Sequence, residues 1–283
     1  MTWLKKYRLE AVMLAPLLLY ILGFTVYPIL QTIAMSFLDR FTGAITLANY
    51  REIIGKVEFK GALFNTVAFA LISLTLEMAA AIVIALILKR RFFGRGFLRA
   101  LLMVPMGVPT LVSGVAMTYI FSINGYLNEL LYRLNIIKLP VDWASGGLRT
   151  LLMVSLADMW KVTPMVILIL LAGLESIQNE VYEAAGIDGA TAWQTFRYVT
   201  LPLLKPYITM AIILRAIDAF RVFELVLVLA GRATPVLSTF AYDEYNNYGN
   251  AYTSAAASAI LLVIIMIFIY GYLKVGGSEE VSG

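Results

Sequence analysis

Six long apolar stretches dominate this sequence, at residues 11–37, 62–88, 98–121, 151–174, 203–229 and 254–273. A helix needs about 20 mostly apolar residues to cross the hydrocarbon of a bilayer, and each stretch reaches that length. Because a chain in lipid must satisfy its backbone hydrogen bonds internally, segments of this kind fold as helices. The sequence therefore predicts an all-α, polytopic membrane protein with six transmembrane helices.

The composition supports a bilayer environment and excludes several chemistries. Hydrophobic residues make up 61% of the 283 residues and charged residues only 14%, with a mean hydropathy of +0.83, whereas a soluble domain is about one quarter charged. The chain has no cysteine and no histidine, which excludes disulfides, thiolate or imidazole metal sites and nucleophiles that depend on a histidine base. Basic cytoplasmic loops explain the net charge of +4 better than nucleic-acid binding does, so no nucleic-acid partner is expected.

Basic residues between the second and third stretches predict the orientation in the membrane. The densest cluster contains Lys89, Arg90, Arg91, Arg95 and Arg99. Cytoplasmic loops are enriched in Lys and Arg, so this cluster is expected on the cytoplasmic side. With six spans, both termini and the loop 175–202 are then cytoplasmic as well.

The amino terminus imitates a signal peptide. Lys5, Lys6 and Arg8 precede an apolar run, but the run is too long for a signal peptide and no cleavage site follows, so a retained first helix is expected. We expect 1–60 to contain the first helix with its outer loop, 61–274 to form a five-helix membrane core, and 275–283 to be a cytoplasmic tail.

The loop between the fourth and fifth spans has the pattern of two short helices joined by a turn. Asn179 is a candidate cap for the first helix, and Gly189 supplies the break, because glycine adopts backbone conformations that a Cβ disfavours. A second helical piece is expected over 191–198, and Pro202 suits the start of the fifth span. Small residues crowd this loop, which fits a surface that another backbone approaches closely. An ordinary amphipathic connector at the membrane interface has a similar pattern.

The central motif of this loop is Glu183-Ala-Ala-x-x-x-Gly189, followed by Leu201-Pro202. It resembles the EAA loop of the permease subunits of ATP-binding-cassette (ABC) importers. The residues 172–177 before the motif and Phe196 after it resemble the sugar-permease branch, which includes maltose, trehalose and glycerol-phosphate permeases. The resemblance covers the chain from about Asn49 onward. It implies the type I ABC importer permease fold and a location in a prokaryotic cytoplasmic membrane.

The resemblance also implies how such a chain works. In this family the EAA loop forms a coupling helix that docks in a cleft of the ATPase subunit. By motif position the docking residues here are Glu183, Ala184, Ala185, Asp188 and Gly189. The chain lacks the G-x-x-x-x-G-K-[ST] phosphate loop, so it is expected to be a non-catalytic subunit that binds no cofactor, with ATP and Mg on the partner ATPase. The expected partners are a second, different permease, two ATPase subunits and an extracytoplasmic sugar-binding protein.

Seven ionisable residues fall within the predicted spans: Glu77, Asp158, Lys161, Arg215, Asp218, Arg221 and Glu224. Each would cost about 2.5 to 3.5 kcal/mol at the centre of a lipid-exposed helix, so they are expected to face protein or water. All except Glu77 are spaced by three, which brings opposite charges together: Asp158 with Lys161 on the fourth span, and Arg215, Asp218, Arg221 and Glu224 in turn on the fifth. Because three residues fall short of a full helical turn, the four charges on the fifth span cannot all point at one spot.

These charges have three interpretations. They hold helices or subunits together, they line a water-filled substrate path, or those at the ends of spans extend to the membrane interface. The resemblance favours the path, since family members with a membrane sugar site build it from the corresponding fourth and fifth spans. The candidate path residues are Asp158, Lys161, Met165, Arg215, Asp218, Arg221 and Glu224, of which Lys161, Arg215 and Asp218 are the strongest. Glu77, alone in the second stretch, is a candidate counter-charge for one of the basic residues.

Two rival functions remain open at this point. An ion-coupled secondary transporter would use the intramembrane charges as a relay, but the sequence has the EAA-like loop and no evident inverted repeat. A membrane enzyme would use Asp158 and Asp218 as a carboxylate pair, but neither lies in a catalytic motif. The leading prediction is the transmembrane subunit of an ATP-driven importer of a sugar, of the maltose/trehalose type, that forms half of the translocation path.

Overall fold

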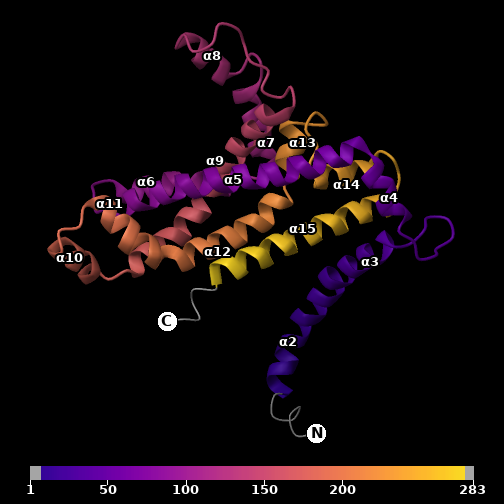
Figure 1. The fold of residues 1–283 in the computed structure, drawn as a ribbon, viewed down its shortest axis with the longest axis horizontal. Helices are drawn as coiled ribbons and strands as arrows, with labels where there is room; N and C mark the ends of the chain where they lie inside the picture. Colours follow the sequence, from indigo (N-terminus) through magenta and orange to yellow (C-terminus); the bar gives the residue numbers. More distant parts are fainter. Residues whose placement is uncertain (1–7, 278–283) are drawn as a thin grey trace. The chain divides into compact units, whose positions relative to one another are not determined.

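The computed structural model of the chain describes residues 8–277, and within that range every element is helical apart from one isolated bridge between Leu38 and Ile45 (Figure 1). Six helical segments are long and apolar enough to cross a membrane: Val12–Ser36, Val57–Lys89, Thr110–Arg133, Gly147–Ser176, Ala192–Phe220 and Ala251–Lys274. The predicted all-α fold with six membrane helices is confirmed. Lys5, Lys6 and residues 278–283 of the expected tail lie outside the described residues.

The helices follow one another along the chain with short connections. The first half contains α2 (Arg8–Ile21), the π-helix η1 (Leu22–Val26), α3 (Tyr27–Ser36), α4 (Ala48–Gly55), α5 (Val57–Lys89), α6 (Arg95–Met103), the 3-10 helix η2 (Val104–Gly107), α7 (Thr110–Phe121) and α8 (Tyr126–Arg133). The second half contains α9 (Gly147–Ser176), α10 (Asn179–Ile187), α11 (Ala192–Thr195), the π-helix η3 (Phe196–Thr200), α12 (Leu201–Phe220), α13 (Glu224–Leu229), α14 (Leu237–Asn246) and α15 (Ala251–Gly277).

The third apolar stretch is not the single helix that its hydropathy predicts. Two prolines interrupt it: Pro105 lies in the first turn of η2, and Pro109 directly precedes α7. Proline has no amide proton and disfavours the helical conformation of the residue before it. Val108 is accordingly extended, with φ −84° and ψ 130°. The break leaves backbone groups at membrane depth that need partners from elsewhere in the fold.

The fifth span begins and ends earlier than predicted, at Ala192 and Phe220 rather than at 203 and 229. Its helix α12 ends at Phe220, Arg221 to Phe223 are non-helical, and a separate helix α13 begins at Glu224. No proline or glycine marks this break. The helix α13 instead packs on α7 at Gly114, where an added Cβ would lie 3.2 Å from the side chain of Val228. This tertiary contact places α13, so the expectation of one continuous helix to residue 229 was wrong.

Contacts divide the described chain into two compact units, residues 8–59 with 240–263, and residues 60–239 with 264–277. In the first unit the Lys56 ammonium binds both carboxylate oxygens of Glu244, at 2.8 and 2.9 Å, and Thr253 donates to the same buried carboxylate at 2.7 Å. Burial lowers the pKa of Lys56, but its bonds to Glu244 and Glu52 outweigh burial, and the pKa lies above its ordinary value. This ion pair joins the end of α4 to α14. The functional division expected from the sequence stays a prediction.

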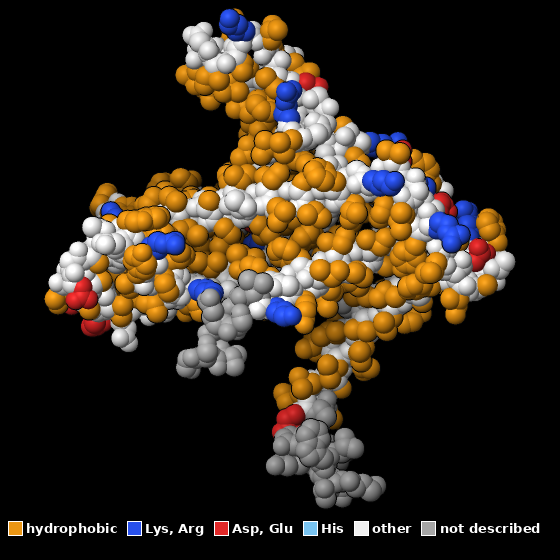
Figure 2. Space-filling model, viewed as in Figure 1, with side chains coloured by type: hydrophobic (Ala, Val, Ile, Leu, Met, Phe, Trp, Pro, Cys, Tyr) orange, Lys and Arg blue, Asp and Glu red, His pale blue; other side chains and the backbone are white. Residues whose placement is uncertain are grey.

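The second unit contains the charged residues and the loop that the sequence singles out. Hydrophobic side chains cover most of the face of the long helices in Figure 2. Beneath them, one end of α5, α9 and α12 packs into a core around Leu88, Leu170 and Leu204. At Gly173 of α9 the helix α12 approaches so closely that an added Cβ would lie 2.5 Å from the ring of Tyr207. This unit therefore holds three membrane helices in fixed register around the site described below.

Candidate functional site

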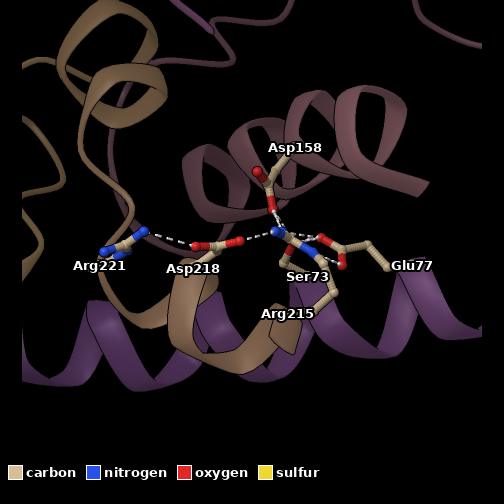
Figure 3. Close-up of polar contacts among 6 residues, drawn as sticks. All are labelled: Ser73, Glu77, Asp158, Arg215, Asp218 and Arg221. Atoms are coloured by element: carbon tan, nitrogen blue, oxygen red, sulfur yellow. Dashed lines mark hydrogen bonds and ion pairs between the residues drawn. The ribbon is translucent and has the colours of Figure 1, made fainter. Parts of the chain in front are cut away.

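A network of charges lies between α5, α9 and α12, and Arg215 is its centre (Figure 3). The Arg215 guanidinium donates through Nε and Nη2 to the two carboxylate oxygens of Glu77, at 2.9 and 3.0 Å. This bidentate contact joins residues that are 138 positions apart and both buried. The expectation that Glu77 is a counter-charge for a basic residue is confirmed, and its partner is Arg215.

Two further carboxylates form ion pairs with Arg215. Its Nη2 also donates to Asp158 at 3.2 Å, and its Nη1 donates to Asp218 at 3.2 Å. The hydroxyl of Ser73 lies 2.7 Å from Asp158 and 2.9 Å from Glu77, between the two buried carboxylates. Each buried charge thus has a charged or hydroxyl partner, as a low-dielectric environment requires.

The network continues from the buried centre toward solvent-accessible space. Asp218 binds Arg215 with one carboxylate oxygen and Arg221 with the other, the latter at 3.1 Å. The exposed fraction of the side chain rises from 4% at Arg215 to 46% at Asp218 and 65% at Arg221. The charges therefore alternate in sign from buried to exposed side chains, in the order Glu77, Arg215, Asp218 and Arg221. Figure 3 shows these four residues in a row.

A cavity of about 340 Å³ opens beside this network. Six of the seven predicted path residues line it: Asp158, Lys161, Arg215, Asp218, Arg221 and Glu224. The remaining lining residues are Thr110, Val162, Val222, Phe223 and Leu225. Met165 is not among the lining residues and lies half-buried on α9. The break between α12 and α13 supplies much of the wall, so the tertiary packing of α13 shapes the cavity.

The pairing of the outer charges differs from the prediction. The Lys161 ammonium donates to the carbonyl of Val108 at 2.6 Å rather than pairing with Asp158. This bond satisfies a backbone acceptor that the proline break in the third span leaves outside a helix. Arg221 pairs with Asp218 rather than Glu224, because the helix ends between Arg221 and Glu224. The predicted pairs Arg215–Asp218 and Asp218–Arg221 are confirmed.

The loop between α9 and α12 has the predicted helix, turn, helix form. The turn is a Schellman motif: Ala190 donates to the carbonyl of Ala185 at 3.0 Å, and Gly189 donates to Gly186 at 3.1 Å. Gly189 has φ +72°, the left-handed conformation that this motif requires and glycine adopts without strain. A capping box of Thr191 and Gln194 starts α11. Residues 192–200 are helical as expected, but they are not a separate piece: α11 and η3 continue without a break into α12, so Pro202 lies inside this helix rather than at the start of the span.

The start of the first loop helix corrects one detail of the prediction. Asn179 is the first residue of α10 rather than its cap, and Gln178 occupies the cap position without a side-chain hydrogen bond. Glu180 lies in the first turn, where its charge suits the helix dipole.

Basic residues of the second unit hold the base of this loop. Arg95 and Arg99 both donate to one carboxylate oxygen of Glu175, at 2.6 and 2.7 Å. The Lys89 ammonium lies 3.6 Å from the ring centre of Tyr182, a cation–π contact. The dense basic cluster and the loop therefore lie at the same end of this unit.

The predicted docking residues have different environments. Glu183, Ala184, Asp188 and Gly189 are exposed, whereas Ala185 is buried against the unit. Ile187 and Trp193 flank them, with 87% and 68% of their side chains exposed. The loop thus has a surface of small residues between two exposed apolar side chains. Ala185 and Tyr182 contact the rest of the unit on the opposite side of the loop.

Comparison with known proteins places this arrangement in a family. The model of the "Binding-protein-dependent transport system inner membrane component" family matches residues 77–274, which include both the charged cavity and the loop. The chain belongs to this family. The permease is 38% identical to the trehalose/maltose transport system permease protein MalF of Thermococcus litoralis, over 96% of this chain and 95% of that protein. It is 30% identical to the trehalose transport system permease protein SugA of Mycobacterium tuberculosis, over 98% and 91% of the two chains.

Solved structures show the same fold. The permease matches a chain of a bacterial ABC transporter that imports the acidic polysaccharide alginate, with a TM-score of 0.85, 20% identity, and 99% and 98% of the two chains covered. It also matches a chain of the alginate transporter in complex with a pentasaccharide-bound periplasmic protein, with a TM-score of 0.83 and 21% identity over 95% and 94% of the chains. The type I ABC importer permease fold expected from the sequence is confirmed. This permease is a multi-pass membrane component of an ABC importer.

Several site residues were missed in the sequence. Ser73 has a weak signal, since it lies one helical turn before Glu77 and a hydroxyl at that spacing contacts the same face. No sequence signal marks the carbonyl of Val108 or the cavity wall formed by Val222, Phe223 and Leu225. Their positions depend on where two helices break.

Proposed function

We propose that this permease forms one half of the membrane path of an ATP-driven importer for a neutral saccharide of the trehalose/maltose type. The observation that carries the substrate class is the 38% identity, over nearly the full length of both chains, to a permease named for trehalose and maltose transport. The cavity between α9, α12 and α13 supplies the path, and the α10–α11 loop couples it to an ATPase.

The charge balance of the cavity suits a neutral, polyhydroxylated substrate. Its lining contains three basic side chains, Lys161, Arg215 and Arg221, and three acidic ones, Asp158, Asp218 and Glu224. Balanced charge gives no net attraction for an anion. Carboxylates accept and guanidinium or ammonium groups donate hydrogen bonds, which is the chemistry that sugar hydroxyls need. The side chains of Val222, Phe223 and Leu225 add an apolar wall for a sugar face.

The residues of the network have different proposed roles because their side chains differ in burial. Glu77, Asp158 and Arg215 are buried and satisfy one another, so they hold α5, α9 and α12 in register. Arg221 has most of its side chain exposed and makes one ion pair, which leaves further guanidinium donors free to reach a substrate. We therefore assign positioning to Arg215 and direct sugar contact to Arg221, Glu224 and the remaining donors of Lys161.

The α10–α11 loop is the proposed docking surface for the ATPase. Glu183 and Asp188 would meet basic groups of that partner, and Ala184 and Gly189 would permit close approach. The loop joins α9 to α12, and both of these helices line the cavity, so a displacement of α10 would move them. The loop and the basic cluster lie at one end of the unit, which supports a cytoplasmic position for both. With six spans, the two termini would then be cytoplasmic as well.

The complete importer would contain a second permease of different sequence, two ATPase subunits and an extracytoplasmic sugar-binding protein. This chain would bind no cofactor, and ATP with Mg would belong to the ATPase chains.

ATPase activity of the assembled complex in proteoliposomes tests the proposal. With its partner chains and a trehalose- or maltose-loaded binding protein, hydrolysis should be stimulated and labelled sugar should accumulate inside. Glu183→Lys should abolish both effects while assembly stays normal, because it reverses a charge on the docking surface. Glu180→Lys is the matched control, since Glu180 is exposed on the same helix outside the motif, and it should retain most of the stimulation.

Two outcomes would overturn the proposal. Full transport by the Glu183→Lys complex would remove the coupling assignment. Transport by this chain alone on a proton or sodium gradient, without ATP, would support an ion-coupled secondary transporter instead.

A further inference from the structure

A second, apolar groove lies in the same unit, between the second and fourth spans and the segment α6–η2 that precedes α7. It has a volume of about 440 Å³ and is walled by α5, α6, η2 and α9. The lining residues are Ala80, Ile84, Leu101, Leu102, Val104, Pro105, Met159, Trp160, Thr163, Pro164 and Ile167. Apart from the indole N–H of Trp160, the hydroxyl of Thr163 is the only polar side-chain group among them, and it already donates to the carbonyl of Met159 at 2.6 Å. A groove with so few polar groups fits a hydrocarbon rather than a sugar.

The groove has the depth and the opening of an acyl-chain site. Trp160 and Ile167 are seven residues apart on α9, so the groove extends over about 10 Å along that helix. One leaflet of a bilayer contains about 15 Å of hydrocarbon, so the groove covers most of that depth. Leu101, Val104 and Trp160 remain 54%, 58% and 41% exposed, so the groove opens sideways, in the direction of the lipid.

An excess of positive charge lies above one end of the groove. The helix α6 begins with Arg95, about 9 Å along the axis from the groove residue Leu101. Arg95 and Arg99 share the single carboxylate of Glu175, and the buried Nε atoms of both have no hydrogen-bond partner among the described residues. Arg90 and Arg91 are exposed directly before them. The segment 90–99 with Glu175 therefore contains four arginines and one carboxylate, and two of the arginines are exposed and open to an anion from outside.

Exposed aromatic side chains place this charged segment at a membrane interface. Phe93 is fully exposed and Phe97 is 76% exposed, beside the exposed arginines. Phenylalanine and arginine side by side, in a connection that leads into an amphipathic helix such as α6, are typical of segments that lie at the boundary between headgroups and acyl chains. The positive charge, the aromatic residues and the apolar groove occur in the order that a phospholipid presents from headgroup to tail.

We propose that this groove and the segment 90–99 form a binding site for one anionic phospholipid of the cytoplasmic leaflet. The headgroup phosphate binds the exposed Arg90 and Arg91, beside the partly exposed guanidinium groups of Arg95 and Arg99, and one acyl chain occupies the groove against Trp160. The site is separate from the charged cavity: Met159 and Trp160 line the groove, whereas Asp158 and Lys161 of the same helix line the cavity. The lipid would thus support the broken third span from outside.

Quenching of Trp160 fluorescence by brominated lipids tests this site. The full chain, with Trp3, Trp143 and Trp193 replaced by phenylalanine, is placed in nanodiscs that contain phospholipids brominated on the acyl chain. Brominated phosphatidylglycerol in a phosphatidylcholine background should quench Trp160 at lower mole fraction than brominated phosphatidylcholine in the same background. Two exposed arginines near an anionic headgroup predict a preference of about thirtyfold.

Variants separate the headgroup from the acyl chain. The pair Arg90→Gln and Arg91→Gln should remove most of the preference, whereas Arg133→Gln with Lys138→Gln, which removes two exposed charges outside the 90–99 segment, should leave it unchanged. Ala80→Phe should block the groove and abolish selective quenching, whereas Ala79→Phe, on an exposed neighbour that does not line the groove, should not.

Three results would overturn the proposal. Equal quenching by the two lipids would mean an unselective lipid-facing surface. No quenching by either lipid would mean that protein, such as a second copy of the chain, covers the groove. A preference that persists in the Arg90/Arg91 double variant would remove the headgroup assignment. None of these results depends on transport, so this proposal and the importer function fail or stand separately.

Discussion

The Arg215 network and the α10–α11 loop place charged residues in opposite environments within one unit of the permease. Arg215 and Glu77 are buried and satisfied by side chains of the same chain, whereas Glu183 and Asp188 are exposed and make no ion pair among the described residues. A buried charge that loses its partner destabilises the fold, because no water replaces the partner. An exposed charge without a partner costs little in the isolated chain. The first region is therefore built for structure, and the second is available to another protein.

The largest expected effect comes from removing the centre of the network. Arg215→Met should destabilise the permease by about 3–5 kcal/mol, because it leaves the carboxylates of Glu77 and Asp158 buried without a cation. Arg221→Met is the matched control and should be close to neutral, since the Arg221 side chain is 65% exposed. Denaturant unfolding in detergent measures both. Equal stability of the two variants would show that burial does not distinguish the two arginines.

A smaller effect is expected where two helices of the same unit touch. Gly173→Ala should destabilise by about 1–3 kcal/mol, since the new Cβ would lie 2.5 Å from the Tyr207 ring and 2.8 Å from Leu204. Gly61→Ala, where no atom lies within 4 Å, is the control and should not destabilise. Thermal unfolding of the two variants in the same detergent tests this, and a Gly173→Ala variant as stable as Gly61→Ala would contradict the close packing of α9 and α12.

A substitution in the turn of the α10–α11 loop should destabilise the loop without destabilising the helix core. Gly189→Ala forces a Cβ into the left-handed conformation at φ +72° and should cost about 1–2 kcal/mol in the turn. Hydrogen exchange of the amides of Gly189 and Ala190 should accelerate, while exchange in α12 stays unchanged. Gly186→Ala, three residues earlier in a helical conformation with open space around it, should leave exchange the same or slower. Faster exchange throughout α12 in Gly189→Ala would mean that the loop is part of the core.

The smallest effect belongs to the half-exposed ion pairs at the base of the loop. Glu175→Gln should lower stability by less than about 1 kcal/mol, because Glu175 is 50% exposed and solvent screens its bonds to Arg95 and Arg99. The difference from wild type should shrink further as salt is raised. Melting temperatures at low and high salt measure it, with Glu180→Gln as the exposed control. A loss as large as that of Arg215→Met would remove the contrast between the two regions.

The sequence predicts local charge pairs well only where the helix is continuous. Arg215, Asp218 and Arg221 are spaced by three within or at the end of α12, and both predicted pairs form. Glu224 has the same spacing, but the helix ends before it. Lys161 has the same spacing from Asp158, but a carbonyl that the proline break exposes is its partner. Spacing determines which face of a helix a side chain occupies. It does not determine which group on a neighbouring helix the side chain binds.

The sequence by itself determined the six membrane helices, the turn at Gly189 and the presence of charges that had to face protein or water. These follow from hydrophobic length, from the conformational freedom of glycine and from the cost of an unpaired charge in lipid, all of which are properties of a segment alone. Only the tertiary structure decided that Arg215 binds Glu77 and that the fifth span ends at Phe220. Both depend on how α5, α9, α12 and α13 pack, and packing is a property of helices distant in sequence that no local pattern contains.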